Sequence, residues 1–212
     1  MTLTEFVSQF IAGLKSTSLL EFIAVVTGIA SVWFSKKENI LVFPVGLINT
    51  IIYTYLSVKA HLLGEASVNI YYTIMSIYGW VLWSKKDQSL HPVVLIRHSS
   101  AKEWVQHALF FGMFYCTIYA ALNYLQKEFA PGAIPWADAF ASATAFTAMW
   151  LMARKKVESW IWWIFTNIAS IPLYFVKGYV FTSVYFFILL IIAFAGWAEW
   201  KQRATKHQQL SG

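Results

Sequence analysis

Two tryptophans and an asparagine in the stretch WIWWIFTNIASIPLYF are the first residues in this sequence whose types and spacing suggest chemistry. Trp160, Trp163 and Asn167 follow one another at spacings of three and four, so one face of a helix would carry all three. Asn167 lies about eight residues into an apolar run, which places it ~12 Å below the start of that helix. A buried amide without a partner is costly, so we expect Asn167 to face a neighbouring helix or a polar cavity.

A second asparagine, Asn49, lies at a similar depth in an earlier apolar run. One isolated asparagine would be interpreted as a bond between two helices. Two at matching depths favour a binding site, and we predict that Asn49 and Asn167 face each other across a cavity at the membrane midplane. Trp163 is the expected stacking surface, whereas Trp160 begins its run and suits the headgroup region. Tyr72 is a second candidate for ring contact, and Asn69, Gln106 and Asp138 are further candidates for the site. Asp138 also suits a helix cap. His107, next to Gln106, suits the membrane interface.

The predicted site is uncharged and rich in amide and aromatic groups. Aromatic faces stack on rings and attract cations, and an amide offers a donor and an acceptor together, so a flat aromatic solute fits. None of the ten carboxylates lies in the middle of an apolar run, which argues against proton or sodium coupling. We find no catalytic motif, no cofactor motif and no metal-ligand cluster, and the single cysteine excludes an internal disulfide. The sequence therefore predicts a passive transporter and not an enzyme.

The elements that position these residues are predicted to be membrane-spanning helices. Of the 212 residues, 58% are hydrophobic and only 12% are charged, whereas about a quarter are charged in soluble proteins. A helix needs about 20 mostly apolar residues to cross a bilayer. Spanning segments are expected to be helices, because open strands would leave backbone N–H and C=O groups without hydrogen bonds in lipid. Seven segments qualify, at about 18–35, 39–58, 66–84, 104–125, 136–153, 159–176 and 179–200.

The distribution of positive charge orients these seven segments. Of the 16 lysines and arginines, 12 follow the first, third, fifth and seventh segments, and only 4 lie on the other side. The positive-inside rule then places the N-terminus outside and the C-terminus in the cytoplasm. We accordingly attribute the pI of about 9.3 to topology and not to nucleic-acid binding.

An internal repeat relates the first three segments to the last three. GWVLWSKK (Gly79 to Lys86) and GWAEWKQR (Gly196 to Arg203) share Gly-Trp-x-x-Trp before basic residues, and an asparagine precedes each by about thirty residues. The predicted plan is a possible interfacial helix at 1–17, a three-helix repeat at 18–84, a loop and linker helix at 85–126, a parallel second repeat at 136–203 and a tail at 204–212.

Other residues of these segments have more general roles. Pro44 and Pro172 fall within the second and sixth segments, where they are candidate hinges. Trp80, Trp83, Trp197 and Trp200 close the third and seventh segments, and we assign them to the aromatic belt at the membrane surface.

The pattern W-x-x-W-x-x-x-N of Trp160, Trp163 and Asn167, the 3+1+3 plan and the closing GWxxW together resemble the PnuC family of bacterial vitamin transporters. The resemblance covers residues from about 18 to 203. It implies a fold similar to a full-length SWEET sugar transporter and facilitated diffusion of nicotinamide riboside, an NAD precursor, across the bacterial inner membrane. It also implies a homo-oligomer, specifically a trimer. The alternatives are another vitamin such as thiamine or riboflavin, a SWEET-like sugar, or, in a different class, a seven-span receptor.

Overall fold

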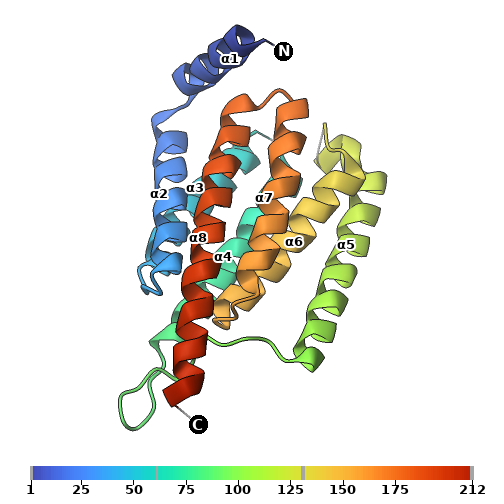
Figure 1. Ribbon diagram of the computed structural model, residues 1–212. Coiled ribbons are helices and arrows are strands. Elements are labelled where there is room, and N and C mark those ends of the chain that lie inside the picture. The colour runs from blue at the N-terminus through green and yellow to red at the C-terminus, as the bar shows by residue number, and fades with distance from the viewer. Residues whose placement is uncertain (1, 61, 130–131, 211–212) are drawn as a thin grey trace.

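The computed structural model describes residues 2–60, 62–129 and 132–210, and all the long elements in these ranges are α-helices (Figure 1). Among the described residues, five helices are long and apolar enough to cross a membrane, namely α2, α3, α5, α7 and α8. The remaining two of the seven predicted spans, α4 and α6, are long but less apolar, because α4 carries Glu65, Asn69 and three tyrosines, and α6 carries Asp138, a serine, two threonines and two tryptophans. The helices are α1 (Leu3–Ser16), α2 (Leu19–Lys36), α3 (Val42–Lys59), α4 (Leu63–Ser84), α5 (Ala101–Phe129), α6 (Pro135–Ala153), α7 (Ser159–Val176) and α8 (Val180–Leu210).

Local sequence signals set several helix starts. Thr2 and Glu5 form a capping box on α1, in which each side chain accepts a hydrogen bond from the backbone N–H of the other residue. Ser18 caps α2 in the same way from one side, and Pro135 occupies the first turn of α6.

The two prolines that were predicted to be hinges have different positions. Pro44 lies in the first turn of α3, where a backbone N–H has no partner within the helix, so it does not interrupt α3. Pro172 lies inside α7 and removes one of its backbone hydrogen bonds. A hinge at either proline stays a prediction.

Six helices form a closed ring in which each packs against two others. The order around the ring is α2, α3, α4, α6, α7, α8 and back to α2. α5 packs outside the ring against α6, and α1 packs against α8 (Figure 1). α3 and α7 thus stand opposite each other across the ring interior.

The helices on either side of α5 match in their spacing along the chain. α3 and α7 span residues 42–59 and 159–176, α4 and α8 begin at 63 and 180, and α2 and α6 end at 36 and 153. Each pair is 117 residues apart, as are Glu38 and Lys155, which follow α2 and α6 with φ of 57° and 52°. We call α2–α4 the first triplet and α6–α8 the second triplet. The triplets contact each other in two places, α2 with α8 and α4 with α6. Because α2 matches α6 and α4 matches α8, each of these two contacts corresponds to the other.

The two GWxxW stretches form a core at one end of the ring. Trp83 and Trp200 are only 8% and 0% exposed, whereas Trp80 is 39% exposed. The indole Nε1 of Trp83 donates to the carbonyl of Ala153 at 3.0 Å, and that of Trp200 donates to the carbonyl of Lys36 at 3.2 Å. The prediction of a membrane-surface belt is therefore wrong for Trp83 and Trp200, because each indole finds a carbonyl at the end of a neighbouring helix.

The glycines of the same stretches let an aromatic ring approach the backbone. A Cβ at Gly196 would lie 2.6 Å from the ring of Trp160, and one at Gly79 would overlap the ring of Phe43. Trp160 is fully buried and meets Trp200 edge-on, with ring centroids 5.6 Å apart. Trp160 is thus a core residue and not an anchor at the headgroups.

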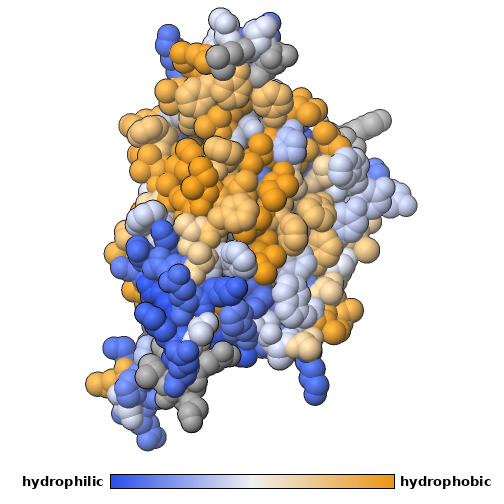
Figure 2. Space-filling model, viewed as in Figure 1, coloured by the Kyte–Doolittle hydropathy of each residue, from blue (hydrophilic) through white to orange (hydrophobic). Residues whose placement is uncertain are grey.

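Charge and apolar surface occupy different parts of the molecule. On the face that Figure 2 shows, hydrophobic residues cover the upper and middle part, and hydrophilic residues gather toward the end that carries the C-terminus. We call this end the basic end. It carries the lysines and arginines that end or follow α2, α4 and α6 and those of late α8, namely Lys36, Lys37, Lys85, Lys86, Arg154, Lys155, Lys156, Lys201, Arg203 and Lys206. An apolar surface of this extent on a chain with several spanning helices is that of a multi-pass membrane protein.

Candidate functional site

Asn167 lies on α7 and is the buried amide that the sequence singles out. It is 2% exposed, and its Oδ1 has no hydrogen-bond partner among the described residues. Buried polar atoms are nearly always hydrogen-bonded, so an orphan acceptor indicates a missing partner. The adjacent Thr166 is already paired, because its hydroxyl donates to Trp162 and meets Thr144 of α6. Asn167 therefore offers an unused acceptor inside the bundle.

Aromatic side chains pack against the face of α7 that carries Asn167 one turn after Trp163. Trp163, one turn before Asn167, approaches Tyr72 of α4 with ring centroids 6.3 Å apart and the planes tilted by 49°. Tyr72 also meets Phe146 of α6 edge-on, at 6.2 Å. α4 and α7 each pack against α6, so the Trp163–Tyr72 contact runs past α6 on the inner side of the ring. The structure thus brings together Trp163 and Tyr72, two of the predicted residues.

Asn49 does not occupy the position equivalent to Asn167. Its Nδ2 donates to the carbonyl of Ala24 on α2 at 2.6 Å. In the 117-residue spacing Asn49 matches Thr166, and Asn167 matches Thr50, so the predicted equivalence is wrong by one residue. One residue turns a helix by about 100°, which directs the two amides to different neighbours.

Asn49 nevertheless lies near the ring interior, next to a tyrosine of α8. A Cβ placed on Gly28 would meet both the Asn49 amide and the hydroxyl of Tyr185, at 2.8 and 2.5 Å. The absence of a side chain at Gly28 therefore lets Asn49 and Tyr185 approach the same point of α2.

Four tyrosines from four ring helices lie near one another in the interior, and sequence reasoning found only one of them. The rings of Tyr174 and Tyr185 both contact Phe186 of α8, with centroids 5.2 and 5.5 Å apart. Tyr53 and Tyr72 lie within electrostatic range of both tyrosines. A signal for Tyr174 was present, since it continues the face of Trp160, Trp163 and Asn167 seven residues further on. No sequence pattern linked Tyr185 to the site, because its neighbour Asn49 lies on a different helix and is distant along the chain.

The second-tier candidates lie elsewhere. Asn69 donates to the backbone carbonyl of Glu65 in its own helix at 2.9 Å. Gln106 is exposed and the adjacent His107 is buried, which reverses the predicted positions of these neighbours. Asp138 accepts from the backbone N–H of Ile134, the N-cap residue of α6, and pairs with Lys177 at 2.7 Å, so its carboxylate is engaged at the start of the helix.

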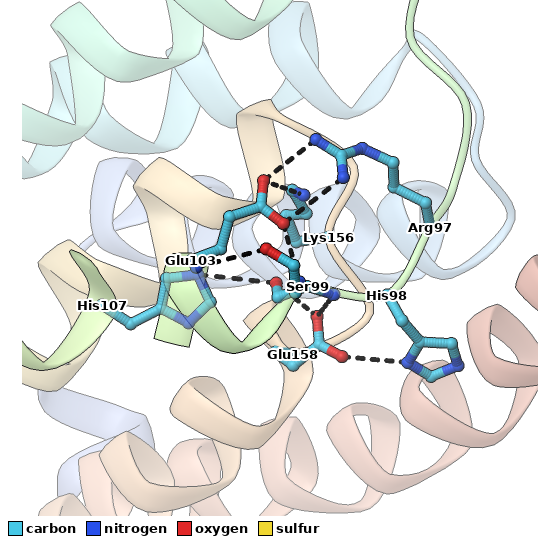
Figure 3. Close-up of polar contacts among 8 residues, drawn as sticks. Arg97, His98, Ser99, Glu103, His107, Lys156 and Glu158 are labelled. Carbon is cyan, nitrogen blue, oxygen red and sulfur yellow. Dashed lines mark hydrogen bonds and ion pairs between the residues drawn. The ribbon is translucent and has the colours of Figure 1, made fainter. Parts of the chain in front are cut away.

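A polar network at the basic end fastens the segment before α5 to the turn between α6 and α7 (Figure 3). Glu158 accepts hydrogen bonds from the N–H and hydroxyl of Ser99 at 2.9 and 2.7 Å, and it lies 2.9 Å from Nδ1 of His98. Burial alone would raise the pKa of Glu158, but these hydrogen bonds outweigh it and lower the pKa below its ordinary value.

The same network includes an ion-pair cluster on the other side of Ser99. Glu103 binds both Arg97 and the buried Lys156. Burial lowers the pKa of Lys156 although its contact with Glu103 acts in the opposite direction. These groups are mutually paired, so the network serves to hold the turn in place. Among the described residues no cluster of His, Cys, Asp and Glu is arranged to hold a metal ion.

The geometry thus combines an orphan amide acceptor with tryptophan and tyrosine rings inside a helical ring. Such groups bind and orient a ring-bearing solute by stacking and neutral hydrogen bonds. None of the side chains gathered around Asn167 is positioned as a catalytic nucleophile with a base, so binding is the chemistry that this arrangement supports.

Comparison with known proteins agrees with this architecture. A family model described as nicotinamide mononucleotide transporter matches residues 18–202. The nicotinamide riboside transporter PnuC of Escherichia coli (strain K12) is 24% identical over 215 residues, which cover 92% of this chain and 90% of that protein. The riboflavin/roseoflavin transporter RibM of Streptomyces davaonensis is 23% identical over 184 residues, covering 85% and 84%.

A solved structure has the same fold. The crystal structure of the vitamin B3 transporter PnuC matches with a TM-score of 0.72 at 22% identity, over 97% of this chain and 90% of that chain. Because the family model spans most of the sequence, the chain belongs to the nicotinamide mononucleotide transporter family, whose members are membrane transporters and not enzymes.

Proposed function

We propose that this protein carries nicotinamide riboside across the bacterial inner membrane. The observation that carries the proposal is the buried orphan Oδ1 of Asn167, one helical turn after Trp163, whose ring contacts Tyr72 of α4. The name of the Escherichia coli relative, a nicotinamide riboside transporter, supports the choice of solute.

The chemistry of the solute fits the groups on the inner side of the ring. Nicotinamide riboside has a cationic pyridinium ring, which the faces of Trp163 and Tyr72 would attract and stack upon. Its carboxamide or ribose hydroxyls would donate to Asn167 Oδ1. Tyr53, Tyr174 and Tyr185 would contribute further ring and hydroxyl contacts. Asn49, whose N–H already binds Ala24, would contribute less.

The membrane arrangement is part of the same proposal. The first and second triplets are two parallel repeats joined by α5, in the 3+1+3 manner of SWEET-like proteins. The matched spacing of 117 residues and the exchange of contacts between the triplets support it. All seven helices α2 to α8 then cross the membrane, with the N-terminus outside and the basic end in the cytoplasm. The assembly is expected to be a trimer, for which chemical crosslinking in membranes is the test.

Transport is proposed to be uncoupled. Asp138, which is near the start of α6, is already bound to Lys177. Glu65 and Asp138 lie within electrostatic range of Tyr174, but among the described residues no ion pair or hydrogen bond joins a carboxylate to Asn167, Trp163 or Tyr72. Proteoliposomes should therefore equilibrate radiolabelled nicotinamide riboside without an ion gradient. Accumulation above equilibrium when a proton or sodium gradient is imposed would contradict facilitated diffusion.

Riboflavin is the second candidate solute, because RibM is a riboflavin transporter and resembles the chain over most of its length. A calorimetric panel of nicotinamide riboside, riboflavin, thiamine and glucose on the purified protein decides between them. Tighter binding of any of the other three than of nicotinamide riboside would overturn the assignment.

Asn167→Ala tests the site directly. Removing a neutral hydrogen bond costs roughly 0.5–1.5 kcal/mol, and an unpaired buried partner costs about 1–3 kcal/mol, so affinity should fall about tenfold or more. Folding should be retained, because Oδ1 has no partner to lose. Asn49→Ala is the matched control and should lower thermal stability more and affinity less. Unchanged affinity in Asn167→Ala would place the site elsewhere.

A further inference from the structure

The two triplets are bonded to each other reciprocally at the basic end. Trp83, in the third helix of the first triplet, donates to Ala153 at the end of the first helix of the second. Trp200 lies in α8, the third helix of the second triplet. Its indole donates to the carbonyls of Ser35 and Lys36 at the end of α2, the first helix of the first triplet, at 3.1 and 3.2 Å. Ala153 and Lys36 are equivalent in the 117-residue spacing, as are Trp83 and Trp200. One contact is therefore made twice, once in each direction.

Residues that are equivalent to each other also touch at this end. The hydroxyl of Ser35 donates to the sulfur of Met152, and Glu38 pairs with Lys155 at 2.7 Å. The rings of Trp83 and Trp200 approach with centroids 6.1 Å apart. Two equivalent residues can meet only on the axis that relates the two repeats. These contacts therefore lie on the central axis, in line with the interior that holds Asn167.

We propose that Trp83 and Trp200, with the carbonyls that they bind, form a gate that closes the basic end of the transport path. We call this set the tryptophan gate. Solute that leaves along the axis toward the cytoplasm can pass only when both indole–carbonyl bonds break and the triplets separate. This inference rests on the proposed transport function and adds the residues that control release.

The chemistry of the bonds suits a gate that opens repeatedly. The carbonyls of Ala153 and Lys36 end their helices, where they lack an intrahelical partner, and water can replace the indole once the end is exposed. The carbonyl of Ser35 also accepts from the backbone N–H of Glu38 at 2.9 Å, so it stays paired when Trp200 leaves. The bonds are neutral, so each contributes modestly and a ligand can shift the balance between closed and open states. Phe43 and Trp160 hold Trp83 and Trp200 edge-on, at 5.0 and 5.6 Å, which fixes both rings in position for the shared contact.

The test measures access to the basic end without any solute. Ser35 is 3% exposed on the axis and would be changed to cysteine in a Cys116→Ser background, since Cys116 is exposed. Inside-out vesicles are then treated with a membrane-impermeant maleimide. Trp83→Phe and Trp200→Phe keep the ring and remove the N–H donor. Each should raise the labelling rate of this cysteine roughly two- to tenfold, and the double variant should raise it further.

Matched controls separate a gate from general loosening. Trp80→Phe and Trp197→Phe change the other tryptophan of each GWxxW stretch and should leave labelling unchanged. A second reporter, Ser183→Cys, is 6% exposed near the start of α8, far from the basic end. The proposal is overturned if labelling of the Ser35→Cys reporter stays constant in the gate variants. It is also overturned if labelling rises equally at both reporters, or if it rises equally in the control variants. Because no solute is used, a wrong solute assignment would leave this result standing.

Discussion

Replacing Gly196 by alanine should destabilise the protein, because the added methyl group would overlap a ring that cannot move away. The new Cβ would lie 2.6 Å from Cη2 and Cζ2 of Trp160 and 2.7 Å from Cε2, where ordinary contacts are 3.4–4 Å. Trp160 is fully buried and packs against Trp200, so the ring has no free space on its other side.

The expected magnitude follows from two opposing effects. Overpacking of a filled core costs typically about 1–3 kcal/mol. Alanine forms helix more readily than glycine by up to about 1 kcal/mol, which offsets part of that cost. With the full offset, we therefore expect Gly196→Ala to lower the free energy of unfolding by up to about 2 kcal/mol. Gly112 is the matched control, because a Cβ there meets nothing within 4 Å, and Gly112→Ala should be neutral or slightly stabilising.

The assay is unfolding in mixed micelles by SDS titration, with both variants measured beside the parent protein. The comparison is repeated in a Trp160→Ala background, where the ring is gone and the penalty of Gly196→Ala should largely vanish. Equal stability of Gly196→Ala and Gly112→Ala, or the same penalty with and without the Trp160 ring, would refute the reasoning.

Three further outcomes are expected. Asp138→Asn should lower thermal stability with unchanged solute affinity, because the ion pair with Lys177 is lost at a helix end; a large loss of affinity would give Asp138 a role in binding. Gln106→Ala should leave uptake unchanged because the side chain is exposed, so impaired uptake would contradict its placement. Glu158→Gln should cost stability at neutral pH. The lowered pKa of Glu158 stabilises the fold above the ordinary carboxyl pKa of about 4.3, and this stabilisation is lost as the pH falls through the lowered value. The stability of parent and Glu158→Gln, followed by unfolding from pH 7 to pH 3, should thus converge at low pH, and a pH-independent difference would argue against this origin.

Sequence patterns predicted the helices well, because apolar runs of this length and composition have few alternatives. Glycine and tryptophan at matched positions predicted that the first three spans correspond to the last three, and the helices keep a spacing of 117 residues between the two groups. The depth of Asn167 in its run was enough to predict that its amide would be buried.

The faces of individual side chains were harder to predict. Gln106 and His107 are neighbours, and which of them turns inward depends on how α5 packs on α6. The asparagine register failed for the same reason, since a difference of one residue changes the neighbour of an amide. Trp83 and Trp200 were misplaced because a tryptophan near a span end suits the membrane surface as well as a carbonyl on another helix, and that carbonyl is distant in sequence.

The pair formed by Glu38 and Lys155 on the axis has a consequence for assembly. If two copies of the first triplet associated with each other in the same geometry, two carboxylates would meet where Glu38 now meets Lys155. Two copies of the second triplet would bring two ammonium groups together at that point. Either homodimer would place like charges in contact at this position, where Lys155 is buried and repulsion is therefore strong. Opposite charges at one duplicated position therefore favour pairing of unlike halves, so a chain cut within α5 should reassemble from its two different fragments and not from two identical ones.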